Sequence, residues 1–227
     1  MLTTIKDKVK SFRSYVYDFV IFTTTSRWYR EVLLDCPMDV TLLDVGIGTA
    51  TSLIDNRDIV VSKRMRVVGV DYDLDYVESA QANIAASSLV DTTSVEHASI
   101  HDFNKDYSAK FDIIYFSGSF MIIPQQVEAL THCVKMLRSP VPKTPGGGNI
   151  YFTQTFEHRS LIGLYVTPYV KKLLRLLTID FGEVTYEDDF KKVLERAKVD
   201  IVYTRPIRSS YFRTQTLVCA KPGGKKD

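Results

Sequence analysis

Two short apolar runs, each reaching an aspartate, constrain the fold of this chain more than any other feature. The first covers residues 42–45 and continues into a glycine turn at residues 46–49, with the sequence LLDVGIGT; the second covers residues 65–70 and ends at Asp71. Glycine lets the backbone approach a ligand closely, and a carboxylate at the end of the next parallel strand can accept both hydroxyls of a ribose. The two runs therefore predict neighbouring parallel strands whose carboxyl ends meet over a nucleoside-containing ligand.

Length and composition limit the alternatives. The chain has 227 residues and 45% hydrophobic content, which is enough for one sizeable α/β core and short for two full domains. The net charge of +2 gives no strong nucleic-acid signal, and the three cysteines lack the spacing of a metal site or disulfide frame. The sequence shows neither a signal peptide nor an apolar run that would span a bilayer, so we expect a cytoplasmic protein without a bound metal.

The hydrophobic periods alternate between strand and helix, which predicts a doubly wound α/β fold. The last two strands have no helix between them, so an antiparallel C-terminal hairpin should close an otherwise mostly parallel, seven-stranded sheet. We expect an N-terminal helical cap at residues 1–37, a ligand-binding domain at 38–222 with a helical insertion at 156–190 on the acceptor side, and a disordered tail at 223–227. The expected strands are 41–45, 65–70, 93–98, 111–116, 149–155, 199–204 and 214–220, and the expected helices are 2–20, 27–34, 50–56, 74–88, 124–137, 161–177 and 186–198.

The order acid-x-Gly-x-Gly-x-small at residues 44–50 closely resembles motif I of the class I S-adenosylmethionine (SAM)-dependent methyltransferases, with Ala50 in place of the usual third glycine. The resemblance covers roughly residues 38–221, because that family also has a parallel sheet closed by an antiparallel hairpin. It implies a Rossmann-like methyltransferase that uses SAM. A nicotinamide-dependent oxidoreductase is disfavoured, because Thr51 stands where the dinucleotide pattern needs its third glycine and too little chain remains for a substrate domain.

The resemblance also assigns roles to single residues. The turn at 46–49 would pass beneath the sugar and the methionine tail, Asp44 would face the methionine ammonium through water, and Asp71 would bind the ribose hydroxyls. Near the adenine, Ser99 stands where the family has an acid, and Asp102 either touches the base or faces solvent. The expected cofactor contacts are Asp44, Gly46, Ile47, Gly48, Thr49, Asp71, Tyr72, Ser99, Ile100, Ser117 and Gly118.

Two residues are candidates for catalysis. Of the four histidines, His158 alone falls over the expected position of the methyl group, where it would be a general base or an ordinary exposed loop residue. Tyr17, in the pair Tyr17-Asp18, and the segment 27–30 (RWYR) resemble elements that precede motif I in the ubiquinone-biosynthesis and phospholipid N-methyltransferase group. Their aromatic rings would either stabilise a sulfonium or an amine by cation–π attraction, or pack in the core of the cap.

The loop at residues 116–121 (FSGSFM) lacks the Pro-Pro-aromatic tetrapeptide of enzymes that methylate nucleic-acid bases and glutamine, and it resembles the loop of small-molecule methyltransferases. We therefore expect a small-molecule or lipid-like acceptor. The basic amphipathic segments 2–20 and 161–177 either contact an anionic membrane peripherally or are core helices. A protein or RNA methyltransferase remains an alternative, as does an inactive SAM-binding regulatory or scaffold subunit, and the oligomeric state is not predicted.

Overall fold

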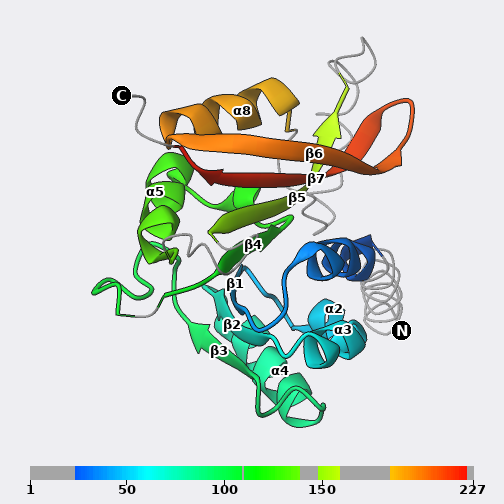
Figure 1. The fold of residues 1–227 in the computed structure, drawn as a ribbon, viewed down its shortest axis with the longest axis vertical. Helices are drawn as coiled ribbons and strands as arrows, with labels where there is room; N and C mark the ends of the chain where they lie inside the picture. The colour runs from blue at the N-terminus through cyan, green and yellow to red at the C-terminus, as the bar shows by residue number, and fades with distance from the viewer. Residues whose placement is uncertain (1–23, 109, 139–147, 159–184, 224–227) are drawn as a thin grey trace, which may run out of the picture.

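A computed structural model describes residues 24–108, 110–138, 148–158 and 185–223 of the chain (Figure 1). Seven strands form one sheet in the order β3-β2-β1-β4-β5-β7-β6. The strands are β1 Thr41–Val45, β2 Arg66–Asp71, β3 Thr93–His97, β4 Ile113–Ser117, β5 Asn149–Glu157, β6 Val199–Ser209 and β7 Arg213–Pro222. The helices are residues 24–35, α2 Thr51–Asp55, α3 Arg57–Ser62, α4 Leu74–Ala85, the 3-10 turn η1 Phe120–Ile122, α5 Gln126–Met136 and α8 Glu187–Arg196.

The pairing of the strands confirms the predicted fold class. Strands β3, β2, β1, β4 and β5 are parallel to their neighbours, whereas β7 runs antiparallel to both β5 and β6. The carboxyl ends of the five parallel strands therefore lie at one edge of the sheet, which is the edge where ligands bind in this architecture. The tip of the β6–β7 hairpin lies at the same edge, because Arg213 at the start of β7 pairs with Glu157 at the end of β5.

Helices cover both faces of the sheet, and alternate residues of each strand point to opposite faces. Leu42 of β1 belongs to a core cluster that includes residues of helix 24–35, α2, α3 and α4. Its neighbour Leu43 belongs to a second cluster, which includes residues of α5 and α8. Figure 1 shows this division, with α5 and α8 on one side of the strands and the blue helix, α2, α3 and α4 on the other.

Several predicted boundaries were wrong. The segment after β1 forms two helices, because the Asn56 side chain donates to the carbonyls of Ser26 and Ser52 and separates α2 from α3. Helix α5 begins at Gln126, so Pro124 precedes the helix and does not occupy its first turn. Strands β6 and β7 are longer than predicted, and Gly223, assigned to the tail, donates its N–H to the carbonyl of Lys198 over 2.8 Å.

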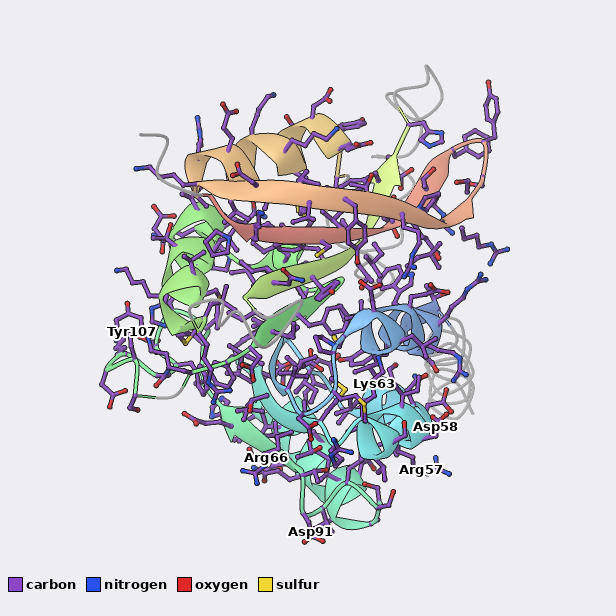
Figure 2. All side chains as sticks on the ribbon, in the orientation of Figure 1. Arg57, Asp58, Lys63, Arg66, Asp91 and Tyr107 are labelled. Carbon is purple, nitrogen blue, oxygen red and sulfur yellow. The ribbon has the colours of Figure 1, made fainter. Side chains whose placement is uncertain are left out.

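Helix 24–35 is joined to the elements that follow β1. The hydroxyls of Thr25 and Ser52 lie 2.7 Å apart, and Lys63, labelled in Figure 2, donates to the carbonyls of Leu33, Leu34 and Cys36 at the end of the helix. An ammonium group at a helix C-terminus satisfies carbonyls that lack intrahelical partners and complements the helix dipole. These contacts fix the helix beside the start of the ligand-binding domain.

Some expectations fall outside the described residues. These are the helices at 2–20 and 161–177, most of the insertion at 156–190, and residues 224–227 of the tail. The ends of the insertion that are described belong to β5 and α8. Within the described ranges, no helix has the length and hydropathy of a membrane span.

Candidate cofactor and active site

The glycine turn follows β1 at the carboxyl edge of the sheet. Gly46 has φ +77° and Gly48 has φ +59°, a backbone region that favours glycine. A Cβ on Gly46 would lie 2.5 Å from Cβ of Ser119, whereas one on Gly48 would meet nothing within 4 Å. Gly46 is therefore needed for packing, and Gly48 borders open space. Ala50, which replaces the third glycine of the motif, also has a positive φ of 59°.

Ile47 and Thr49 complete this turn. The Ile47 side chain packs on β2, since a Cβ on Gly69 would lie 2.5 Å from its Cδ1. Ile47 therefore faces the core, and only its backbone is available to a ligand at the turn. The Thr49 carbonyl accepts from the Asn83 side chain of α4 over 3.0 Å. The turn is therefore held on two sides by neighbouring elements.

Asp71 ends β2 directly beside this turn. Its Oδ2 accepts the Gly48 N–H over 2.9 Å and its Oδ1 accepts the Asp73 N–H over 3.1 Å. Each carboxylate oxygen has a second lone pair, so both retain the capacity to accept a hydroxyl. The carboxylate is thus fixed against the turn in a position suited to the two hydroxyls of a ribose.

Asp44 is fully buried inside β1. Its Oδ2 accepts the hydroxyl of Tyr29 over 2.7 Å, and its Oδ1 is one of the few buried polar atoms in the described part of the chain without a hydrogen-bond partner. Burial raises the pKa of Asp44 to about 7, opposed by the Tyr29 hydrogen bond and assisted by the negative charge of Asp71. A buried, unpaired carboxylate oxygen fits a ligand that carries an ammonium group, as SAM does.

The loop after β4 forms the third part of the site. The Ser119 hydroxyl donates to the carbonyl of Val45, which ties this loop to the end of β1. Gly118 has φ +69°, and a Cβ there would lie 3.0 Å from the Trp28 ring. The Trp28 indole N–H donates to Oε1 of Gln215 on β7 over 3.3 Å. Trp28 therefore covers the loop and links it to the hairpin.

The residues expected around adenine follow the neighbouring strands β2 and β3. Tyr72 is 71% exposed beside Asp71, and its carbonyl lies 3.0 Å from Nε2 of His97. Ser99 accepts the His101 N–H with its hydroxyl, and Ile100 is buried in the core on the α5 side. Their contacts with adenine stay predictions. Asp102 pairs with Lys105 over 2.7 Å at the surface, in line with the solvent-facing alternative.

His158 lies against the β6–β7 hairpin. Its Nδ1 is 3.1 Å from the Tyr211 carbonyl, and its Nε2 is 2.9 Å from the Thr214 hydroxyl. Both ring nitrogens are engaged, so a general-base role would require the ring to turn, and that role stays a prediction. Tyr17 lies outside the described residues.

The sequence did not point to Tyr29 as the partner of Asp44, or to Gln215 as the partner of Trp28. The only signal was the aromatic segment 27–30, which resembled an element of related enzymes. A separate hollow of about 950 Å³ lies at the opposite edge of the sheet. Two residues of its lining, Arg66 and Asp91, are labelled in Figure 2. Its lining includes the first residues of β1, β2 and β3, so it is remote from the glycine turn.

Comparisons with solved structures agree with this architecture. Magnesium protoporphyrin IX methyltransferase from Synechocystis PCC 6803, solved with bound S-adenosylhomocysteine (SAH), has a TM-score of 0.59 and 15% identity over 88% of this chain and 83% of that one. Geranyl diphosphate C-methyltransferase from Streptomyces coelicolor A3(2) has a TM-score of 0.60 and 11% identity over 85% and 77%. The [4+2]-cyclase SpnF has a TM-score of 0.68 and 14% identity over 88% and 82%. At such low identities these likenesses report the fold alone.

The strand order, the glycine turn and the two aspartates, Asp44 and Asp71, together define a Rossmann-like domain of the type that binds a nucleoside cofactor. Residues 42–140 match the methyltransferase domain family, while no curated protein sequence matches the chain. These findings support a SAM-dependent methyltransferase with SAM as its cofactor.

Proposed function

We propose that this methyltransferase acts on a small-molecule or lipid-like acceptor. The observation that carries the proposal is the position of Trp28, which is only 7% exposed and packs over Gly118 while Gln215 holds its indole N–H. The loop after β4 borders the side of the site where the methyl group would be presented, so an aromatic wall narrows the approach there. Such a wall suits a compact, apolar acceptor, since small-molecule sites are mostly apolar with few polar groups.

SAM supplies an electrophilic methyl group on a sulfonium, so the protein contributes mainly by binding and alignment. Asp71 would hold the ribose, and Asp44 the ammonium, which together fix the cofactor at two points along its length. The buried Trp28 ring would exclude water from the approach to the methyl group. Both ring nitrogens of His158, the candidate base, are engaged in hydrogen bonds, so an acceptor that is already nucleophilic fits this arrangement best.

The structural neighbours support a small acceptor by analogy. They include enzymes named for magnesium protoporphyrin IX, geranyl diphosphate and mitomycin, the last of which is a 7-O-methyltransferase. All three names denote small organic molecules. The ubiquinone-biosynthesis and phospholipid N-methyltransferase group remains the subgroup that the sequence favours.

The tip of the β6–β7 hairpin favours an acceptor drawn from an anionic membrane. Tyr211 and Phe212 are 77% and 46% exposed, and their rings pack edge to face with centroids 5.0 Å apart. Residues 204–214 carry three arginines and no acid, although Arg205 pairs with Glu31 over 3.3 Å. Exposed aromatic rings beside arginines suit the interface of a bilayer that contains anionic lipid. The tip lies at the same sheet edge as the glycine turn, so contact there would bring the site toward the lipid.

A transfer assay tests the acceptor class. The protein is incubated with SAM labelled on the methyl group and a cell extract, which is then separated into lipid, small-molecule, RNA and protein fractions. We expect label in the lipid or small-molecule fraction and, at a SAM concentration well below saturation, roughly tenfold or more less label with an Asp71→Ala variant. Label in RNA or protein would instead support the polymer alternative. No label in any fraction, with SAH binding intact, would favour a regulatory or scaffold subunit.

A further inference from the structure

Asp44, the acid of the glycine motif, is hydrogen-bonded by Tyr29, a residue that lies outside the motif. Tyr29 lies on helix 24–35, is 3% exposed, and donates its hydroxyl to Asp44 Oδ2 over 2.7 Å. Its ring packs edge to face against Tyr115 of β4, with centroids 5.1 Å apart and an interplanar angle of 83°. The ring is therefore held from the side, and the hydroxyl has a fixed direction.

We propose that Tyr29 is a positioning residue of the cofactor site, which favours the charged form of the Asp44 carboxylate and leaves Oδ1 for the ammonium group of SAM. The proposal rests on SAM being the cofactor. It gives a role in the cofactor site to Tyr29, which lies outside the glycine motif. The geometry supports it, because one carboxylate oxygen is engaged by the tyrosine and the other has no partner.

Tyr29 matters because this carboxylate is costly to keep charged. Three titratable groups face Asp44: Tyr29 from helix 24–35, Tyr115 from β4 and Asp71 from β2. None of them is a cation. Burial raises the pKa of Asp44 to about 7, and the hydrogen bond from Tyr29 is what opposes that rise. Loss of the hydroxyl would therefore raise the pKa further and favour the neutral acid, which attracts an ammonium group only weakly.

Binding of the cofactor should consequently expel a proton. At neutral pH part of the protein carries a protonated Asp44, and a cationic group beside Oδ1 favours the carboxylate. Affinity should fall by up to about tenfold for each pH unit below the pKa of Asp44 in the free protein. With Phe at position 29, this dependence should move to higher pH.

The chain offers a matched control. Tyr115 is as deeply buried as Tyr29 and contacts its ring, but its hydroxyl is hydrogen-bonded to Thr153 over 2.9 Å and not to Asp44. Tyr115→Phe thus removes a buried hydroxyl from the same cluster without removing the contact under test. Both variants are compared with the parent by circular dichroism before binding is measured.

The experiment is calorimetric titration of each protein with SAH from about pH 6 to about pH 7.5, where an α-amino group stays largely charged. Two buffers with different ionisation enthalpies give the number of protons released. We expect proton release by the parent, an unchanged profile for Tyr115→Phe, and for Tyr29→Phe an affinity at neutral pH that is roughly tenfold or more weaker, with a profile shifted to higher pH.

Two outcomes would overturn the proposal. One is a Tyr29→Phe variant whose affinity falls equally at every pH or not at all. The other is SAH binding by the parent protein without proton release, which decides the matter even if the Tyr29 variant does not fold. If the parent does not bind SAH at all, the cofactor assignment fails and the proposal falls with it, so the two failures are distinguishable.

Discussion

Replacing Asp44 by Asn should make the protein more stable at neutral pH while it impairs cofactor binding. The carboxyl has a pKa of about 7 in the folded protein, mainly because it is buried, against about 3.9 in an unfolded chain. A raised folded pKa means that the folded state binds the proton more tightly. The stability of the parent should therefore fall as pH rises from about 4 to about 7, since the unfolded state releases this proton first.

The size of the effect follows from the two pKa values. At 1.36 kcal/mol per unit, a difference of about three units costs ~4 kcal/mol once both states are ionised. Between about pH 5 and about pH 8, this group alone should lower the free energy of unfolding by about 2–3 kcal/mol. The Asn variant lacks this slope. Its amide can still accept from Tyr29, but its NH₂ replaces the unpaired Oδ1 and costs about 1–3 kcal/mol, so its net gain at pH 8 is about 1–3 kcal/mol.

Urea unfolding of parent and variant at the two pH values measures this directly. The informative quantity is the change in unfolding free energy from pH 5 to pH 8 in the parent minus the same change in the variant, because the contributions of groups that do not interact with Asp44 cancel. A difference below about 0.5 kcal/mol would refute the argument, since it would mean that Asp44 titrates near its ordinary value in the folded protein.

Three further predictions concern other parts of the site. Asp71→Ala should weaken SAH binding by about 1.5–3 kcal/mol, the range for a hydrogen bond to a charged group, as measured by calorimetry on a folded variant. Gly118→Ala should lower the unfolding free energy by about 1–2 kcal/mol because of its positive φ, and should shift the fluorescence of the single tryptophan. Replacing Tyr211 and Phe212 by Ser should reduce flotation with vesicles that contain phosphatidylserine at low salt. The control Val90→Ser, which changes an exposed residue on the α4–β3 connection, should not reduce it. If the parent protein is absent from the floating fraction at both salt concentrations, with and without phosphatidylserine, the membrane contact is refuted.

Sequence reasoning predicted the sheet well, because strand and turn signals are local. The strand ends that position Asp44 and Asp71 follow from apolar runs and from the rule that parallel strands end at one edge. Helix α3 was missed because its sequence, RDIVVS, contains three β-branched residues in succession, which have weak helix propensity. It forms through tertiary packing, since Ile59 and Val60 are buried against the sheet.

The side-chain partners of the site were beyond local patterns. His158 meets Tyr211 and Thr214 more than fifty residues along the chain, and this contact depends on the register between β5 and β7. The length of β6 could not be read either, because the residues near the hairpin tip are exposed and show no apolar alternation. Contacts between side chains that are far apart in the sequence depend on how the helices and strands pack, and the local pattern of a single sequence does not predict that packing.

The two aromatic residues of helix 24–35 show why the helix belongs to the site and is more than a cap. Trp28 and Tyr29 are consecutive, so their side chains leave the helix about 100° apart. One therefore covers the loop after β4, and the other reaches the acid of β1. A small rotation of the helix would move both contacts together, so the position of the Trp28 ring, which is the proposed acceptor wall, would be coupled to the charge of Asp44.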